Sequence, residues 1–422
     1  MTSTAFDKRS VMRAATEHMV PGIAQIQRLI GAGAFEAAAE GAEVLLSDGR
    51  TLIDFGSYAV MLLGHRPEPV VRAVQEALET TPAATRMLVN PYSALLAERL
   101  TAMLDPGTLS RVVFGLNGAD AVEAALKLAI AETGHARVLA VEGGFHGKSM
   151  GALAVTSDPE RRQPVSQFLG AVRHLPLRED AVREAVREAP FAALIFEPIQ
   201  GEGGGRTLPP ELLRRWCADA RAAGVFVIAD EIQVGLRRCG PVSLAVEHEL
   251  RPDAILLGKA LGGGVMPLSA MVCTPALFAP LIRDPFFHTS TFGGHPLSCA
   301  AGLAALDYLD AIGDRIEVTA GALAAGIARI ARENAGVICA DRATGLFGVL
   351  EFTSPALANM TLLECGRRGL LLSRCLSAPT VLRVLPPATT PPQLMARAME
   401  ILHAACGSAS RRAGSDAAAV AG

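Results

Sequence analysis

The sequence predicts an α/β fold with one large, mainly parallel sheet, followed by a smaller α+β domain. Three observations support this prediction. Short apolar runs alternate with helical patterns, polar or glycine-rich turns follow those runs, and the texture of the sequence changes near residue 310. The chain has 422 residues, and at roughly 150 residues per domain this length fits two or three domains.

Four short apolar runs predict strands that are buried on both faces of a parallel sheet. These runs are residues 138–141, 193–196, 225–229 and 254–257. The stretch between the second and third runs reads as a helix, because Pro209 and Pro210 open it, Trp216 falls at helical spacing and Gly224 closes it. Strands that alternate with helices imply right-handed crossovers and an α/β sheet.

The smaller domain is expected after residue 310. A long helical pattern over residues 317–334 is followed there by strand-like runs at 345–352, 369–373 and 381–384. The expected units are an N-terminal segment over 1–55 that packs with the small domain, a large domain over 56–310, a small domain over 311–406 and a disordered tail over 407–422. The tail prediction rests on small, polar residues without periodicity.

Composition excludes several classes of partner. The net charge is 39 − 42 = −3, so no basic patch is expected for nucleic acid or for an anionic membrane. No apolar run reaches the ~18 residues that membrane spanning requires. Eight cysteines without a C-x-x-C pair and no apolar leader block predict a reduced, cytoplasmic chain without a metal site. The 50% hydrophobic content fits a large core or a subunit interface equally well.

Ligands of open α/β sheets bind beyond the carboxyl ends of the strands. Lys259 lies there, between the run 254–257 and a triple glycine. A lysine confined in this way has a lowered pKa and can form a Schiff base. Asp230 closes the run 225–229, and a buried carboxylate there needs a cationic partner, which a protonated pyridine ring would provide.

A phosphate-binding turn is also predicted. Residues 112–114 read as a strand, 115–118 as a turn and 119–127 as a helix, and the backbone N–H groups at a helix N-terminus bind anions. Every strand–turn–helix has this shape, so the signal is weak alone. The rival interpretation of residues 201–205 as a dinucleotide loop is weaker, because residues 206–210 separate it from the next helix.

Seven motifs in order resemble those of the class III, fold-type I aminotransferases that depend on pyridoxal 5′-phosphate (PLP). They are GADAVEAALKLA, GGFHGKSMGALAVT, FEPIQGEGGG, ADEIQVG, LLGKALGGGVMP, HTSTFGGHPLSCAAG and LRVLPP. The similarity extends from about residue 20 to about residue 405. Within the family, the putrescine, ornithine and acetylornithine aminotransferases are the most similar.

The resemblance implies PLP as cofactor and assigns the cofactor-binding residues. Lys259 would hold PLP covalently and move a proton between the substrate Cα and the cofactor C4′. Asp230 would pair with the pyridine nitrogen, and Gln233 would reach the 3-oxygen. The full implied set is Gly118, Ala119, Phe145, His146, Asp230, Ile232, Gln233, Lys259, Ser290 and Thr291.

Within this set, Phe145 and Ile232 would sandwich the ring, and the N–H groups of Gly118 and Ala119 would bind the phosphate. Phe145 could instead be plain core. Ser290 and Thr291 would reach the phosphate of a neighbouring subunit, which implies a homodimer with shared active sites and leaves a tetramer open. His146 is expected to be structural rather than catalytic.

On the substrate side, the resemblance gives Arg383 a carboxylate-binding role. Glu202 would pair with Arg383 when the incoming amine carries no carboxylate there, although Glu197 could share that task. Tyr58 would contact substrate or simply pack. The implied activity is ping-pong transfer from an ω-amine, diamine or amino acid to a 2-oxo acid, either 2-oxoglutarate or pyruvate.

Departures from the family pattern make the substrate less secure than the cofactor. Asn117 replaces the usual serine of the phosphate turn, and Asp120 the usual glutamate, but both keep hydrogen-bonding ability. Arg237 replaces a glycine, and together with Arg238 it could shift the acceptor preference. Two other classes stay open: a racemase, epimerase or aminomutase of the same fold, and a non-catalytic binding protein, against which the presence of Lys259 argues.

Overall fold

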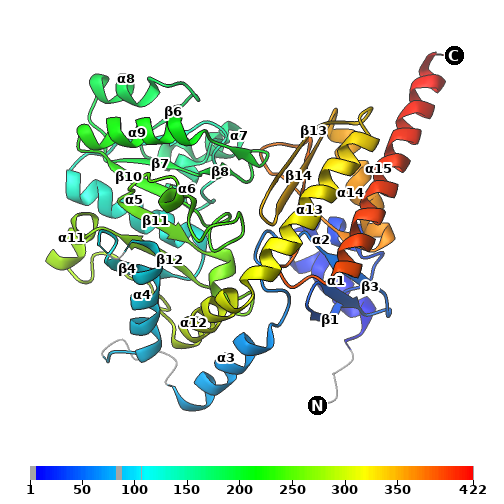
Figure 1. Ribbon diagram of the computed structural model, residues 1–422, viewed down its shortest axis with the longest axis horizontal. Helices are drawn as coiled ribbons and strands as arrows, with labels where there is room; N and C mark the ends of the chain where they lie inside the picture. The colour runs from blue at the N-terminus through cyan, green and yellow to red at the C-terminus, as the bar shows by residue number, and fades with distance from the viewer. Residues whose placement is uncertain (1–5, 82–87, 106, 422) are drawn as a thin grey trace.

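The computed structural model describes residues 6–81, 88–105 and 107–421, and Figure 1 shows a large domain beside a smaller one. The large domain is built on a seven-stranded sheet of order β4-β12-β11-β10-β7-β5-β6. In that order the strands are Arg111–Gly115, Ser269–Cys273, Ala254–Leu257, Phe226–Asp230, Ala193–Phe196, Val138–Val141 and Val172–Leu175. Only β12 runs antiparallel to its neighbours, which confirms the prediction of a mainly parallel sheet.

The central strands are apolar because both faces of the sheet are covered. Alternate residues of β7 enter opposite cores: Leu194 and Phe196 join the core with Trp216 of helix α9 (Pro210–Ala222). Ala193 and Ile195 join the core with Leu128 of helix α5 (Gly118–Thr133). This alternation follows from the two-residue period of a strand. The remaining larger helices of the domain are α3 (Glu68–Thr80), α4 (Pro91–Leu104), α8 (Ala181–Glu188), α11 (Pro275–Arg283) and α12 (Pro296–Ala311).

The small domain packs helices against an antiparallel sheet of order β13-β14-β17-β16. These strands are Ile338–Thr344, Phe347–Phe352, Val381–Val384 and Ser373–Arg374, and the helices are α13 (Gly313–Glu333), α14 (Pro355–Arg368) and α15 (Pro392–Ala421). Leu323, Phe352 and Leu402 belong to its shared core.

The N-terminal segment shares a second sheet with the small domain. It contains helices α1 (Lys8–His18) and α2 (Pro21–Ile30) and strands β1 (Glu36–Glu40), β2 (Glu43–Leu46) and β3 (Thr51–Asp54). Strand β15 (Leu370–Leu371) pairs in parallel with β3. The segment is therefore joined to the C-terminal part of the chain by backbone hydrogen bonds.

The prediction of a disordered tail from Gly407 is wrong for the part of it that the structure describes. Helix α15 continues through Ala421 and projects beyond the body of the small domain (Figure 1); Gly422 lies outside the described residues. The reason is local, because alanine has the highest helix propensity and residues 417–421 include four alanines. Ala409 is buried in the small-domain core.

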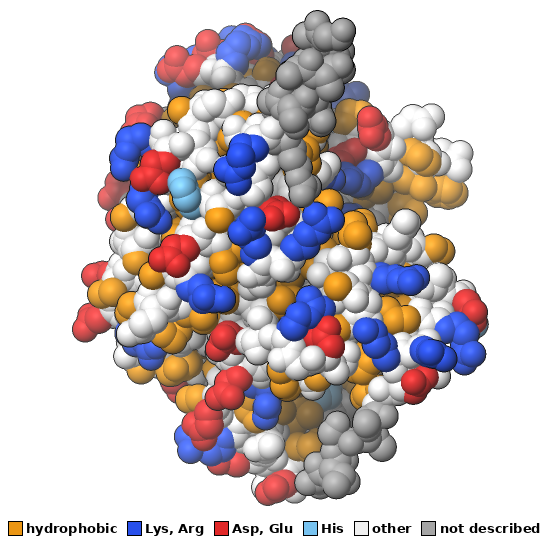
Figure 2. Space-filling view, turned by 90° about the vertical axis from the view of Figure 1, so that its right-hand side faces the viewer, with side chains coloured by type: hydrophobic (Ala, Val, Ile, Leu, Met, Phe, Trp, Pro, Cys, Tyr) orange, Lys and Arg blue, Asp and Glu red, His pale blue; other side chains and the backbone are white. Residues whose placement is uncertain are grey.

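The face of the molecule that carries the small domain has a mixed surface. Figure 2 shows Lys and Arg side chains interspersed with Asp and Glu on this face, without a large region of one sign. In the described part of the chain, no helix has both the length and the apolar character needed to cross a membrane.

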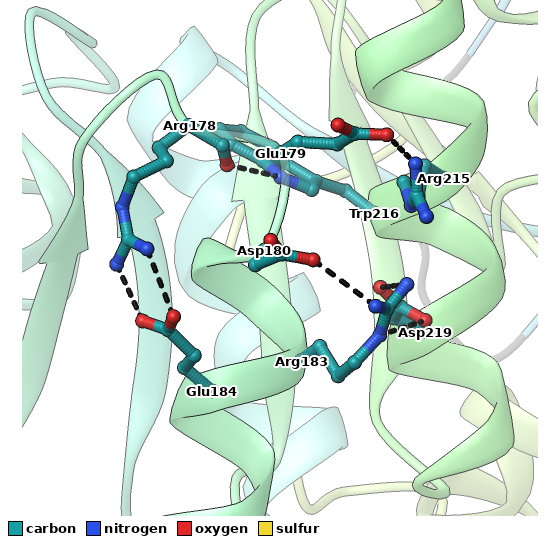
Figure 3. Close-up of polar contacts among 8 residues, drawn as sticks. All are labelled: Arg178, Glu179, Asp180, Arg183, Glu184, Arg215, Trp216 and Asp219. Carbon is teal, nitrogen blue, oxygen red and sulfur yellow. Dashed lines mark hydrogen bonds and ion pairs between the residues drawn. The ribbon is translucent and has the colours of Figure 1, made fainter.

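An ionic network on the large-domain surface fastens the loop after β6 to helices α8 and α9 (Figure 3). Arg178 pairs with Glu184, and Arg215 pairs with Glu179. Arg183 contacts Asp180 at 3.0 Å and Asp219 at 3.4 Å. Beneath these pairs, Trp216 Nε1 donates to the Arg178 carbonyl at 3.1 Å.

Candidate active site

The carboxyl ends of four neighbouring strands meet at one edge of the large sheet. Strands β11, β10, β7 and β5 lie side by side and run in parallel. Lys259 follows β11, Asp230 ends β10, Glu197 follows β7 and His146 lies in the loop after β5. The structure thus brings together the four strand ends that the sequence assigned to one site.

Asp230 is held by its own turn and by a buried histidine. Its side chain is 4% exposed, and its Oδ2 lies 2.7 Å from Nδ1 of His146. The backbone N–H of Ile232 donates to Oδ1 at 3.1 Å. Burial opposes a charge on His146, but the hydrogen bond to Asp230 and the charges of Asp230 and Glu197 raise its pKa. His146 therefore orients the carboxylate, which is the structural role expected from the sequence.

Lys259 is half-buried and has a strained backbone. It begins a short 3-10 helix, Lys259–Gly262, with φ of 44°, a conformation that costs about 1–2 kcal/mol for a residue with a Cβ. Burial lowers the pKa of Lys259, although the charges of Asp230 and Glu202 oppose the shift. A lysine with a lowered pKa has a larger neutral fraction, which can act as a nucleophile or a base.

Glu197 fixes the segment that carries Phe145. Its Oε1 accepts from the Phe145 N–H at 2.8 Å, and its Oε2 accepts from the Gly201 N–H at 3.2 Å. Burial raises the pKa of Glu197 to about 7. The suggestion that Glu197 shares the pairing of Arg383 is not supported, because both of its oxygens serve backbone N–H groups.

Asn117 and Asp120, the two residues of the phosphate turn that depart from the family pattern, hold this turn with hydrogen bonds. Asn117 caps α5, its Oδ1 accepting from the Asp120 N–H at 3.3 Å. Asp120 Oδ2 accepts from the N–H of Leu116 at 2.8 Å and of Asn117 at 3.2 Å. This reciprocal capping box shapes the turn and leaves the N–H groups of Gly118 and Ala119 at the start of the helix. Asn117 and Asp120 therefore both form hydrogen bonds in the turn, as expected for replacements that keep hydrogen-bonding ability.

Glu202 and Arg383 form a buried ion pair at the junction of the two domains. Arg383 Nη1 contacts Glu202 Oε1, and the two side chains are 0% and 7% exposed. Glu202 Oε2 also accepts from the Leu376 N–H at 2.8 Å. Arg383 comes from β17, but it points into the interior, so its interpretation as an exposed edge-strand residue is wrong.

Three other residues of the expected site lie at the surface of the chain. Tyr58 is 61% exposed and, like Ala59, has a positive φ, 51° and 65° respectively. Ser290 and Thr291 are exposed, in a loop between α11 and α12. Among the described residues, no hydrogen bond joins the side chains of these three residues to Lys259, Asp230, Glu197 or His146.

The contacts of Arg237 and Arg238 do not support a direct role for either side chain in binding the acceptor. Arg237 Nη2 lies 3.9 Å from Asp310 Oδ1 in α12. Arg238 is buried and donates to three backbone carbonyls. Among the described residues, neither guanidinium pairs with Glu202, whose ionic partner is Arg383.

Sequence reasoning missed two groups that shape the site. One is Arg238, whose buried position no motif in the chain reveals. The other is Asp54, which accepts from the Gly56 N–H at 2.9 Å, from the Ser57 hydroxyl, and lies 2.9 Å from His65 Nε2. His65 and the Gly56–Ser57 pair were visible as polar residues near Tyr58, but their common partner is eleven residues from His65 and could not be identified by spacing.

Comparison with known proteins agrees with this geometry. The model of the family described as Aminotransferase class-III matches residues 32–406. The ornithine aminotransferase of Toxoplasma gondii has a similar structure, with a TM-score of 0.85, 25% identity, and coverage of 97% of this chain and 96% of that one. An amine transaminase from an uncultivated Pseudomonas species gives 0.80 and 26%, covering 89% and 95%.

A third structure supports the fold alone. The adenosylmethionine-8-amino-7-oxononanoate aminotransferase of Methanocaldococcus jannaschii has a TM-score of 0.86 at 19% identity, and the match covers 95% of this chain and 99% of that one.

Sheet order, strand-end lysine and strand-end aspartate together define a fold-type I PLP enzyme. The chain belongs to the class III aminotransferase family, and its activity is PLP-dependent transamination.

The residues present fit PLP. Gln233 Nε2 is a buried donor with no partner among the described residues, as a ligand to a ring oxygen should be. A Cβ on Gly118 would lie 3.0 Å from Ile232, so glycine lets Ile232 pack against the turn. Lys259 would hold the cofactor, Asp230 would face its pyridine nitrogen, and the α5 N-terminus would hold its phosphate. Bound PLP supplies an electron-accepting ring to the substrate nitrogen.

Within residues 6–81, 88–105 and 107–421, no group of three or more His, Cys, Asp and Glu side chains is placed to hold a metal ion. The buried acids have other partners: Glu231 accepts from Ser243 Oγ at 2.8 Å and from the N–H groups of Leu244 and Ala245 at 3.0 and 2.7 Å.

Proposed function

We propose that the enzyme transfers the amino group of an ω-amine or diamine, and also of an amino acid, to a 2-oxo acid such as 2-oxoglutarate or pyruvate. The observation that carries this proposal is the buried pair between Glu202 and Arg383. A guanidinium binds a carboxylate through two parallel hydrogen bonds. Arg383 can therefore receive the carboxylate of an oxo acid when Glu202 moves aside.

The pair also accounts for the amine half of the cycle. A donor without a carboxylate at this position leaves Arg383 with Glu202 as its partner, so the buried guanidinium keeps a counter-charge. Without such a partner a buried charge is costly. One site can thus accept two chemically different ligands in alternation, as a ping-pong reaction requires.

The acid–base steps fall to Lys259. Its lowered pKa favours a neutral Nζ, which can take the proton from the substrate carbon that bears the amino group and give it up again; PLP bound at Lys259 would supply the electron-accepting ring for this chemistry. His146 orients Asp230 through a contact of 2.7 Å. The negative charge of Asp230 would stabilise a positive charge on the pyridine nitrogen of bound PLP. Lys259 and Asp230 are the catalytic residues of the proposal.

We also propose that the enzyme works as a homodimer with shared sites, with a tetramer as a further possible assembly. Ser290 and Thr291 are exposed, and Phe286 and Phe292 beside them are 79% and 48% exposed. Apolar surface of this kind is typical of protein interfaces. A second copy placed here would bring its Ser290 and Thr291 toward the phosphate turn.

A cytoplasmic location is part of the same proposal. Seven of the eight cysteines are buried free thiols, and Cys339 is exposed and also free. Free thiols are typical of proteins that operate in a reducing compartment.

A donor panel tests the proposed substrates. Diamines, ω-monoamines and amino acids would each be assayed with 2-oxoglutarate and with pyruvate, for the wild type and for Arg383→Gln. Loss of a charged hydrogen-bonding partner costs about 1.5–3 kcal/mol, so kcat/KM for the oxo acid should fall about 10- to 100-fold while that for a diamine changes less. Equal losses for both would refute the role of the pair.

No observation favours the racemase, epimerase or aminomutase alternative. The Glu202–Arg383 pair serves an enzyme that alternates ligands with and without a carboxylate. An isomerase releases an isomer that carries the same functional groups as the ligand it binds, so it has no need for that alternation.

A further inference from the structure

Arg238 is a buried guanidinium that has only backbone partners among the described residues. Its side chain is 1% exposed. Nη1 donates to the carbonyl of Pro386 at 2.7 Å and of Leu346 at 3.3 Å, and Nη2 donates to the carbonyl of Ala59 at 3.4 Å. Burial lowers the pKa of Arg238 to about 10. A buried charge without a carboxylate is costly.

The three carbonyls belong to three separate segments on the substrate side of the site. Ala59 follows Tyr58 in the left-handed segment of the N-terminal part of the chain. Pro386 lies three residues after Arg383, just beyond β17. Leu346 forms the turn between β13 and β14. The guanidinium therefore contacts all three segments, of which the first and the last, at Ala59 and Pro386, are more than 300 residues apart in the chain.

The backbone around Arg238 belongs to the cofactor side. Its turn begins after Gln233 and is closed by hydrogen bonds from Leu236 N–H to the Val242 carbonyl at 2.8 Å and from Cys239 N–H to the Val234 carbonyl at 3.1 Å. The Leu346 N–H returns a bond to the Arg238 carbonyl at 2.8 Å. The side chain and the backbone of Arg238 thus connect the loop that begins at Asp230 to the small domain.

The opposite end of the Tyr58 segment is fixed independently. Asp54 accepts from the Gly56 N–H at 2.9 Å and from the Ser57 hydroxyl. Arg238 fixes the segment at Ala59. Tyr58 therefore lies between segments held by Asp54 and by Arg238. Arg238 also binds the carbonyl of Pro386, beyond the end of the strand that carries Arg383.

We infer that Arg238 is a positioning residue that sets the distance between Arg383, together with the segment that carries Tyr58, and the cofactor loop that begins at Asp230. This inference rests on the proposed role of Arg383. Arg238 itself would contact neither substrate nor PLP. Its substitution should therefore change substrate parameters and leave cofactor affinity intact.

The test uses the holoenzyme and compares Arg238→Lys with Arg237→Gln. Lysine keeps a charge but cannot donate to three carbonyls in the arginine geometry. We expect KM for 2-oxoglutarate to rise at least tenfold in Arg238→Lys, with a smaller change for a diamine and an unchanged Kd for PLP by absorbance titration. Arg237→Gln, which removes a charge one residue away, should stay within twofold of the wild type in every parameter.

A second variant approaches the junction from its other side. Gly345 has φ of 57°, and a Cβ there would lie 2.7 Å from the Arg238 carbonyl oxygen. Gly345→Ala should therefore push the β13–β14 turn away from Arg238 and reproduce the rise in KM without altering the guanidinium. If Arg238→Lys fails to fold, the KM of Gly345→Ala for 2-oxoglutarate still tests the positioning role.

The outcomes separate this inference from the proposed function. If Arg383→Gln leaves KM for 2-oxoglutarate unchanged, the proposed function fails. If Arg383→Gln raises that KM but Gly345→Ala and any folded Arg238→Lys leave it within twofold, only the positioning role is overturned. A loss of PLP affinity that equals the loss of substrate affinity would also overturn it, because the residue would then support the whole site.

Discussion

Charged side chains are arranged differently around Lys259 and on the α8–α9 surface. On that surface each arginine pairs with a carboxylate in solvent, and Arg183 has two such partners (Figure 3). Around Lys259 the charges are buried in single pairs, Asp230 with His146 and Glu202 with Arg383. Exposed pairs are worth little because water screens them, whereas a buried charge that loses its partner is expensive. Burial therefore distinguishes charges that serve chemistry from charges that fasten a loop.

The largest effect is expected from Lys259→Ala. Removal of the amine abolishes covalent attachment of PLP and removes the group that moves the proton, and general acid–base catalysis alone contributes about 10²- to 10⁴-fold. We expect turnover to fall by at least about 10³-fold, as measured by product formation. Lys148→Ala, an exposed lysine in the loop after Phe145, is the control and should keep its activity.

Borohydride reduction of the holoenzyme would locate the attachment site. The chain has four lysines, Lys8, Lys127, Lys148 and Lys259, so peptide mass spectrometry assigns the modified residue without ambiguity. A label on any lysine other than Lys259 would refute the assignment.

Glu202→Ala should destabilise the fold and change ligand response. It leaves Arg383 buried without a counter-charge, which costs about 3–5 kcal/mol, so the free energy of unfolding should fall by that order. A carboxylate ligand can replace the lost partner. We therefore expect 2-oxoglutarate to raise the unfolding midpoint of the variant more than that of the wild type in calorimetry; an equal or smaller rise would contradict the pairing role of Arg383.

Glu197 should make stability depend on pH. Burial raises its pKa from 4.5 to about 7 in the folded protein, so the folded state binds more protons than the unfolded state between those values. The stability contributed is complete below about pH 4.5 and is lost as the pH rises through about 7. The difference in unfolding free energy between the wild-type apoprotein and Glu197→Gln should shift against the wild type between pH 5 and 8. A difference independent of pH would show that Glu197 is ionised throughout.

The smallest effect is expected on the surface. Arg183 is about one-third exposed and pairs with Asp180 and Asp219, so Arg183→Gln should cost about 0.2–1 kcal/mol by denaturant unfolding. High salt should reduce this cost further, and activity should not change. A cost as large as that of Glu202→Ala would remove the distinction between the two regions.

The sequence was sufficient for the parts of the site that are fixed by strand ends. Asp230 directly follows the run 225–229, and Lys259 follows the run 254–257 after one glycine. The parallel order of β10 and β11 places both residues at one edge. The turn at Asn117 was also visible, because capping is decided within four residues. Local sequence therefore predicts the fold class and the positions of Asp230 and Lys259 at strand ends, whereas the remaining cofactor-binding roles rest on the family resemblance.

Contacts between distant segments could not be predicted in this way. Arg238 bonds to Ala59, Leu346 and Pro386, whose spacing in the chain carries no period. The buried orientation of Arg383 was equally uncertain, because a run such as Val381–Val384 fits an edge or a central strand. The helical end of α15 was not predicted for another reason. Its residues have no amphipathic period, so they indicated a disordered tail, although alanine has a high helix propensity.

A single-turnover reaction would show whether the enzyme carries out transamination through Lys259. The holoenzyme would be mixed with an ω-amine, a diamine or a chiral amino acid in the absence of any oxo acid, and the products would be quantified against enzyme sites. We expect about one equivalent of aldehyde or oxo acid per site from at least one donor and loss of the absorbance of the Lys259-bound cofactor. That absorbance should recover when 2-oxoglutarate or pyruvate is added. Loss of optical rotation in the amino acid, with no carbonyl product from any donor, would contradict transamination through Lys259.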